Sequence, residues 1–259
     1  MTPRPAPRSG GSTCGRTTTS ATGRASAAAW TYQALAESAR ILSASSPAVS
    51  GDTVVAAFGS GELVALRANN GNDLWNEALS RASRTSALSE IRDIPGRPVI
   101  YQGDVFAVSH SGVFAATDLR TGQARWSLPV VGVTTPLPAG DVVYVVSKGG
   151  EVICAARESG QIYWVKDLNA GFTPRKKKSR FSFMNPFSAK ELKPLWTSPI
   201  LVNGKLILGG SHGQVIAVNA KTGEIQKRIE LKGASTTSPI AMGDTVYVVT
   251  QEAELIAIR

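Results

Sequence analysis

The chain of 259 residues is long enough to bury a large core in one domain, and 25 glycines and 14 prolines suit many short strands joined by turns. No stretch approaches the roughly 18 uncharged apolar residues of a membrane helix, and the amino terminus lacks the apolar core of a secretory signal. Residues 1–29 carry a net charge of +4 and residues 171–194 carry +6, whereas the whole chain carries +9, so the remaining residues total −1. This nearly balanced remainder argues against a basic nucleic-acid-binding face.

The first segment, residues 1–29, is rich in Ser, Thr, Ala and Arg and contains no acidic residue. Such a composition is typical of a disordered tail, because it offers too little apolar surface to offset the entropy of ordering. We expect these residues to be disordered or non-native, and the folded domain to span residues 30–259.

Five copies of a repeat of about forty residues follow the tail, which predicts an all-β protein of the β-propeller class. Each copy has a short strand opened by proline, an anchor glycine, an alternating apolar strand, a turn and a third strand. A fourth strand follows in the first four copies, so we expect four complete blades and one three-stranded blade. The anchor glycines are Gly51, Gly103, Gly140, Gly204 and Gly243.

A second glycine precedes the fourth strand, 19 or 20 residues after the anchor. Its turn favours a positive φ, which glycine adopts without strain. Four residues beyond this glycine the first three copies carry tryptophan, which we expect to pack between neighbouring blades rather than to stack on a ligand. The residues assigned to blade docking are Gly71, Trp75, Asp118, Gly122, Trp126, Gly160, Trp164 and Gly223.

Between the third and fourth copies, residues 171–194 combine a basic cluster with Phe181, Phe183 and Phe187. This inserted loop has two possible roles. It is a solvated connection between blades, or it is a contact site for anionic lipid or for an acidic partner.

Cysteine and histidine usage predicts neither a metal site nor a catalytic centre. Cys14 lies in the tail, Cys154 lies in a strand pattern as a small buried residue, and the two are not expected to pair. His110 and His212 occupy the same slot of the repeat, just before a turn glycine. No cofactor and no catalytic residue are therefore predicted, and the chain is expected to be a binding scaffold.

The run from Ala116 to Trp126 resembles the A-x-D-x-x-T-G-x-x-x-W docking motif of quinoprotein-type (PQQ-like) propeller repeats. From about Trp30 to Arg259 the order of blades and loops resembles the carboxyl-terminal part of the BamB family, lipoproteins of the outer-membrane β-barrel assembly machine. The resemblance implies an eight-bladed full-length propeller at the periplasmic face of the outer membrane, attached there through a lipidated amino terminus that this chain lacks. It also implies partners: the POTRA domains of BamA, other subunits and unfolded barrel precursors.

One candidate partner-binding residue comes from the same resemblance. The family places an acidic contact loop before the second copy, with a pattern similar to D-[V/I]-x-x-x-P-V, and Asp93 matches its first acidic position. Pro95 occupies the second acidic position, so half of the charge is absent. The resemblance implies that Asp93 helps to bind BamA. The alternative is a solvated loop acid beside Arg92.

Two other functions stay open at this point. The chain could be a fragment of a PQQ-dependent quinoprotein dehydrogenase, although those enzymes are longer and commonly carry a vicinal cysteine pair, which is absent here. It could also be an adaptor propeller of another envelope system. Because the fifth copy stops after its third strand, we expect a truncated form with raw blade edges, a vacancy that closed propellers commonly fill with a strand from the start of the chain.

Overall fold

The computed structural model describes residues 28–34, 45–79, 93–171 and 193–259, and the expected tail 1–29 and loop 171–194 lie almost entirely outside them. The chain divides into two compact units, Met1–Thr31 and Tyr32–Arg259, and the second unit contains every described strand. Within the described residues all regular structure is β, and no helix there is long and apolar enough to cross a membrane.

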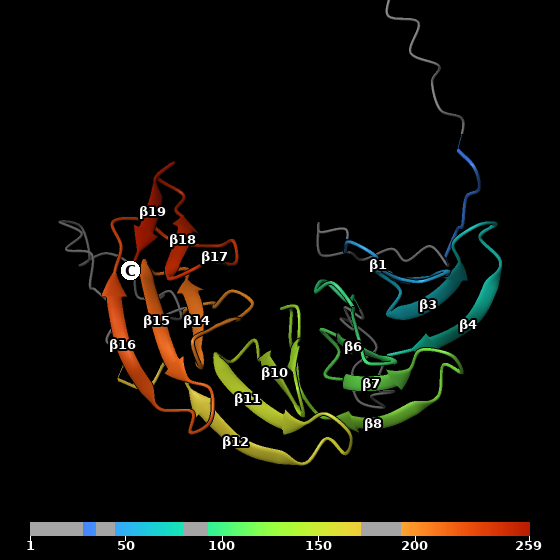
Figure 1. The fold of residues 1–259 in the computed structure, drawn as a ribbon, viewed down its shortest axis with the longest axis horizontal. Helices are drawn as coiled ribbons and strands as arrows, with labels where there is room; N and C mark the ends of the chain where they lie inside the picture. Colours follow the sequence, from blue (N-terminus) through green and yellow to red (C-terminus); the bar gives the residue numbers. More distant parts are fainter. Residues whose placement is uncertain (1–27, 35–44, 80–92, 172–192) are drawn as a thin grey trace, which may run out of the picture. The chain divides into compact units, whose positions relative to one another are not determined.

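In the described ranges, nineteen strands form five antiparallel sheets, in which each strand pairs with its neighbours in sequence (Figure 1). This confirms the expected four complete blades and one three-stranded blade. The first blade contains β1 (Ala48–Ser50), β2 (Thr53–Ala57), β3 (Glu62–Arg67) and β4 (Asp73–Ala78). The second contains β5 (Val99–Tyr101), β6 (Asp104–Val108), β7 (Phe114–Asp118) and β8 (Ala124–Leu128).

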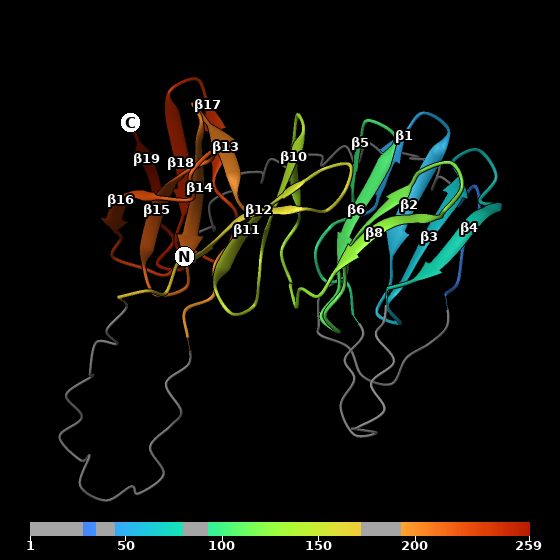
Figure 2. The same cartoon turned by 90° about the horizontal axis from the view of Figure 1, so that it is seen from below.

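The remaining blades repeat the same order along the chain (Figure 2). The third contains β9 (Leu137–Ala139), β10 (Val142–Val146), β11 (Glu151–Ala156) and β12 (Ile162–Asp167). The fourth contains β13 (Ile200–Val202), β14 (Lys205–Gly210), β15 (Gln214–Asn219) and β16 (Ile225–Glu230). The fifth contains β17 (Ile240–Met242), β18 (Thr245–Val249) and β19 (Leu255–Ile258).

The core lies between the blades, in four apolar clusters that each join two consecutive sheets. Successive strand residues point to opposite faces, so one strand serves two clusters. In β10, Val143 and Val145 pack against the second blade, whereas Tyr144 and Val146 pack against the fourth. The central strands are therefore buried on both faces, which explains their continuous apolar runs.

Cys154 on β11 belongs to the cluster between the third and fourth blades and is 2% exposed. Burial raises the pKa of its thiol to about 11, so the thiol stays protonated at neutral pH. It is a small core residue, as the sequence predicted.

A chain of hydrogen bonds joins the inner ends of successive blades, at the residue that precedes each strand-opening proline. The backbone N–H of Arg97 donates to Thr135 Oγ1 at 3.2 Å, and the N–H of Thr135 donates to Ser198 Oγ at 2.8 Å. Each hydroxyl thus accepts from the equivalent residue of the preceding blade. Arg97 is the exception among these pre-proline residues because it has no hydroxyl.

Candidate functional site

Three tryptophans lie against the turn glycines of the following blade. A Cβ added to Gly122 would meet the Trp75 side chain at 2.6 Å, and one added to Gly160 would meet the Trp126 ring at 2.7 Å. A Cβ added to Gly223 would meet the Trp164 ring at 2.7 Å. These glycines have φ near 72°, as does Gly71, so they combine a positive φ with a surface flat enough for an indole ring.

Two of the three indoles also donate a hydrogen bond across the blade boundary. Trp75 Nε1 donates to the Leu119 carbonyl at 2.7 Å, and Trp126 Nε1 donates to the Arg157 carbonyl at 2.8 Å. Both acceptors stand three residues before the turn glycine. On the third strand a bulge follows the residue paired with each tryptophan, and the same bulge occurs in the fourth blade, where Lys227 stands in place of tryptophan.

The third indole departs from this pattern. Trp164 Nε1 is buried and has no hydrogen-bond partner within the part of the chain that the structure describes. The equivalent acceptor, the Ala220 carbonyl, accepts instead from the Tyr144 hydroxyl at 3.0 Å. Tyr144 therefore takes over the bond between the third and fourth blades, and burial raises the pKa of its hydroxyl to about 12, which keeps it a donor.

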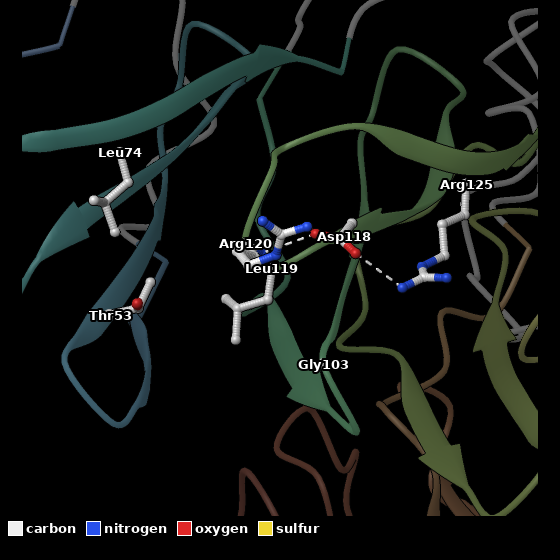
Figure 3. Close-up of a pocket in the computed structure, with 7 residues that line it drawn as sticks. All are labelled: Thr53, Leu74, Gly103, Asp118, Leu119, Arg120 and Arg125. Atoms are coloured by element: carbon white, nitrogen blue, oxygen red, sulfur yellow. Dashed lines mark hydrogen bonds and ion pairs between the residues drawn. The ribbon is translucent and has the colours of Figure 1, made fainter.

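Asp118 closes the turn between β7 and β8. Its Oδ1 accepts from the backbone N–H groups of Arg120 and Thr121 and from the Thr121 hydroxyl, at 2.9–3.0 Å. Its Oδ2 accepts from Arg125 Nη2 at 2.9 Å (Figure 3). The bonds from Thr121, with smaller contributions from Arg120 and Arg125, lower the pKa of Asp118. The carboxylate is thus committed to the turn.

An ion network that the sequence did not suggest links the second and third blades. Asp104 is buried, and its carboxylate contacts the guanidinium groups of Arg125 at 2.5 Å and Arg157 at 3.2 Å. The Arg125 contact is an ion pair without hydrogen-bond geometry, whereas Arg157 Nη1 donates a hydrogen bond to Oδ2. Arg157 Nε also donates to the Gly140 carbonyl at 3.1 Å. The available signal was Arg157 itself, which stands where the other copies carry Ala or Leu.

A recess of about 420 Å³ lies between the first and second blades beside this turn. Figure 3 shows Thr53 and Leu74 on one side, Leu119 and Arg120 on the other, and Arg125 extending away toward the far side of Asp118. Asp118 and Arg125 are paired with each other, so the recess presents no nucleophile beside a base. Among the described residues no group of three metal-binding side chains occurs.

Glu77 on β4 provides a test of packing between the first two blades. Thr117 Oγ1 donates to Glu77 Oε2 at 2.7 Å, and burial raises the pKa of Glu77, partly opposed by this bond. A raised pKa in the folded state means that ionising Glu77 costs folding free energy, so its contribution to stability falls as pH rises above the ordinary glutamate pKa of about 4. We therefore expect the difference in melting temperature between Glu77→Gln and the wild type to shift in favour of the variant as pH rises.

The measurement is the melting temperature of both proteins at pH 4 and pH 7. Glu252→Gln, at an exposed position, is the control and is expected to leave the pH dependence unchanged. An identical pH dependence for wild type and Glu77→Gln would contradict the assignment.

The structure places Asp93 apart from the docking turns, in the connection that leads into the second blade. Its side chain is only 3% exposed, and its carbonyl accepts the His110 N–H at 2.9 Å. The sequence analysis gave Asp93 as a partner-binding residue, with a solvated loop acid as the alternative. The burial of Asp93 does not fit the solvated alternative, and its role in partner binding stays a prediction.

The same connection is held rigidly and exposes a cation. A Cβ added to Gly96 would meet the Thr134 carbonyl oxygen at 2.3 Å, so only glycine fits at this position. The backbone of Arg97 is tied to Thr135, while its side chain is exposed and forms no ion pair among the described residues. Arg97, rather than Asp93, is the charged group that this connection presents.

Comparison with known proteins gives a consistent relationship. The family model described as outer membrane protein assembly factor BamB matches residues 13–166 and 184–259. Curated proteins of that name from Salmonella typhimurium and Escherichia coli are each 26% identical over 218 residues, covering 80% of this chain and 50% of theirs. The chain therefore spans about half the length of the curated relatives it matches.

Solved structures show the same fold. BamB from Moraxella catarrhalis matches with a TM-score of 0.71 and 21% identity, covering 88% of this chain and 62% of that one. A quinohemoprotein alcohol dehydrogenase from Pseudomonas putida matches with a TM-score of 0.52 and 16% identity, covering 83% and 41%. At these identities both matches establish the architecture alone.

Proposed function

The chain belongs to the outer membrane protein assembly factor BamB family, and from this premise we propose that it is a non-catalytic scaffold subunit that binds BamA and assists insertion of β-barrel proteins into the outer membrane. The observation that carries the proposal is the family match over both stretches of the repeat region. The proposed location is the periplasmic face of the outer membrane, and the name of the relatives, outer membrane protein assembly factor, supports an association with the cell envelope.

The contact with the POTRA domains of BamA is assigned to the connection from Asp93 to Pro98. Asp93 serves the contact indirectly, since its buried side chain and its bond to the His110 turn fix the shape of the connection. Arg97 provides the exposed charge, and its restrained backbone lowers the entropy lost on binding. The complementary surface on the partner is acidic.

The test measures binding of the full chain to the purified POTRA domains of BamA from the same organism by biolayer interferometry. Arg97→Glu is expected to weaken binding at least about ten-fold, because it places like charges opposite each other. Lys221→Glu is the control, with the same change of charge at an exposed residue in the turn between β15 and β16. This turn lies at the other end of the blade, so no loss of affinity is expected.

Two outcomes would contradict the proposal. Absence of binding by the wild-type chain would remove the BamA assignment and favour an adaptor of another envelope system. Calcium-dependent binding of PQQ by the chain would instead favour the alternative function, that of a quinoprotein dehydrogenase.

A further inference from the structure

The connections into four consecutive blades share one hydrogen bond. In each, a backbone carbonyl accepts the N–H of the first residue in the turn between the second and third strands, at 2.8–2.9 Å. The acceptor residues are Asp93, Val131, Leu195 and Ala234, and the donors are His110, Lys148, Ser211 and Gln251. Because this bond recurs, the four connections lie at the same end of their blades. We call this end the connector face.

The side chains at these equivalent positions differ in exposure. Asp93 is 3% exposed, whereas Val131 is 42% and Leu195 is 52% exposed. The connector face thus continues beyond the connection that contains Arg97, and it carries apolar side chains over the third and fourth blades. Exposed apolar groups beside a charged contact are typical of an interface whose apolar part is surrounded by polar groups.

A pocket of about 240 Å³ opens beside Leu195, among the connections into the third, fourth and fifth blades. Its described lining residues carry Ser and Thr hydroxyls and apolar groups, and none of them is charged. Trp196 forms part of the wall and is held in place by two contacts. Its Nε1 donates to Asn169 Oδ1 at 2.9 Å, and its ring packs edge-on against the His212 ring, with the ring centroids 4.9 Å apart.

Two of the hydroxyls that line this pocket each accept a backbone hydrogen bond. Ser198 Oγ accepts the Thr135 N–H at 2.8 Å, and Ser211 Oγ accepts the Leu195 N–H at 2.9 Å. Among the described residues neither hydroxyl donates in turn, so each retains its O–H hydrogen for another acceptor. A hydroxyl that already accepts a bond is polarised toward donation. The main-chain carbonyls of a polypeptide are uncharged acceptors that can take such a hydrogen bond.

We propose that this pocket binds an extended, uncharged segment of the partner protein assigned above. Main-chain carbonyls of the segment accept from Ser198 and Ser211, and one apolar side chain packs against Leu195 and Trp196. The described walls offer neutral hydroxyls and apolar groups, which suit the main-chain carbonyls and one apolar side chain of such a segment. The inference rests on the proposed function, because it makes the pocket a second contact of the same interface.

The experiment uses the full chain and the purified POTRA domains of BamA in the same binding assay. Leu195→Asp is expected to weaken binding at least about ten-fold, since a carboxylate would be desolvated against the apolar side chain. Ser211→Ala is expected to weaken binding about three- to ten-fold through loss of the donor. Val165→Asp is the matched control, because Val165 is 50% exposed but lies on β12, the outermost strand of the third blade.

The outcomes separate the two proposals. Failure of the wild-type chain to bind overturns the proposed function itself. Weakening by Arg97→Glu together with unchanged affinity for Leu195→Asp overturns the pocket assignment and leaves the proposed function standing. If Leu195→Asp lowers the melting temperature, Leu195→Ser replaces it as a smaller polar change, and unchanged affinity for that variant also overturns the assignment.

Discussion

Gly160→Ala is expected to destabilise the protein by about 1–3 kcal/mol more than Gly140→Ala. Both glycines belong to the third blade and have positive φ, 72° and 61°, so alanine carries a backbone cost of roughly 1–2 kcal/mol at either position. At Gly140 the new methyl group meets nothing within 4 Å, whereas at Gly160 it meets the Trp126 ring at 2.7 Å. The difference therefore reports overpacking at the blade boundary.

Urea unfolding of the two variants and the wild type measures this difference. Removing the Trp126 ring should abolish this difference. In a Trp126→Leu background, Gly160→Ala and Gly140→Ala are therefore expected to lower the free energy of unfolding by the same amount. Equal destabilisation by both variants in the wild-type background would show that the contact between Trp126 and Gly160 does not dock the blades.

Asp104→Ala is expected to destabilise the protein by about 3–5 kcal/mol, because it leaves the Arg157 guanidinium buried without its carboxylate. The Arg157 side chain is 11% exposed, and among the described residues its guanidinium group keeps the Gly140 carbonyl and the exposed Glu158 as partners. The exposed pair Asp52–Arg67, at 3.8 Å, is the matched control. Asp52→Ala is expected to change the free energy of unfolding by less than about 1 kcal/mol.

The double variant Asp104→Ala, Arg157→Met separates loss of attraction from the cost of a buried lone charge. It should recover much of the stability lost in Asp104→Ala, since methionine fills similar space without a charge. A single variant as stable as Asp52→Ala would show that the network contributes nothing, even though Asp104 is buried.

The repeat architecture was predictable because its signals are local. An anchor glycine, an alternating strand and a second glycine 19 or 20 residues later specify one blade without knowledge of any other residue. The number of strands in each sheet followed from the same pattern, and the structure confirms it. The buried thiol of Cys154 was predictable from its place in a strand.

The contacts between blades were less accessible, since they join residues from different copies. Nothing in the sequence indicated that Tyr144 would take the carbonyl equivalent to those that accept from Trp75 and Trp126. The network around Asp104 depends on the distance between two strand ends that lie 53 residues apart. The pocket beside Leu195 depends on three connections that are separated along the chain.

The sequence by itself determined the β-propeller class, the boundaries of the repeats and the turns that require glycine, because backbone conformation and strand alternation are set by neighbouring residues. Only the tertiary structure decided which charge faces outward in the connection from Asp93 to Pro98. Family pattern favoured the carboxylate, but the structure buries Asp93 and exposes Arg97. Burial of a side chain is set by the turns and blades packed around it, which a short stretch of sequence does not contain.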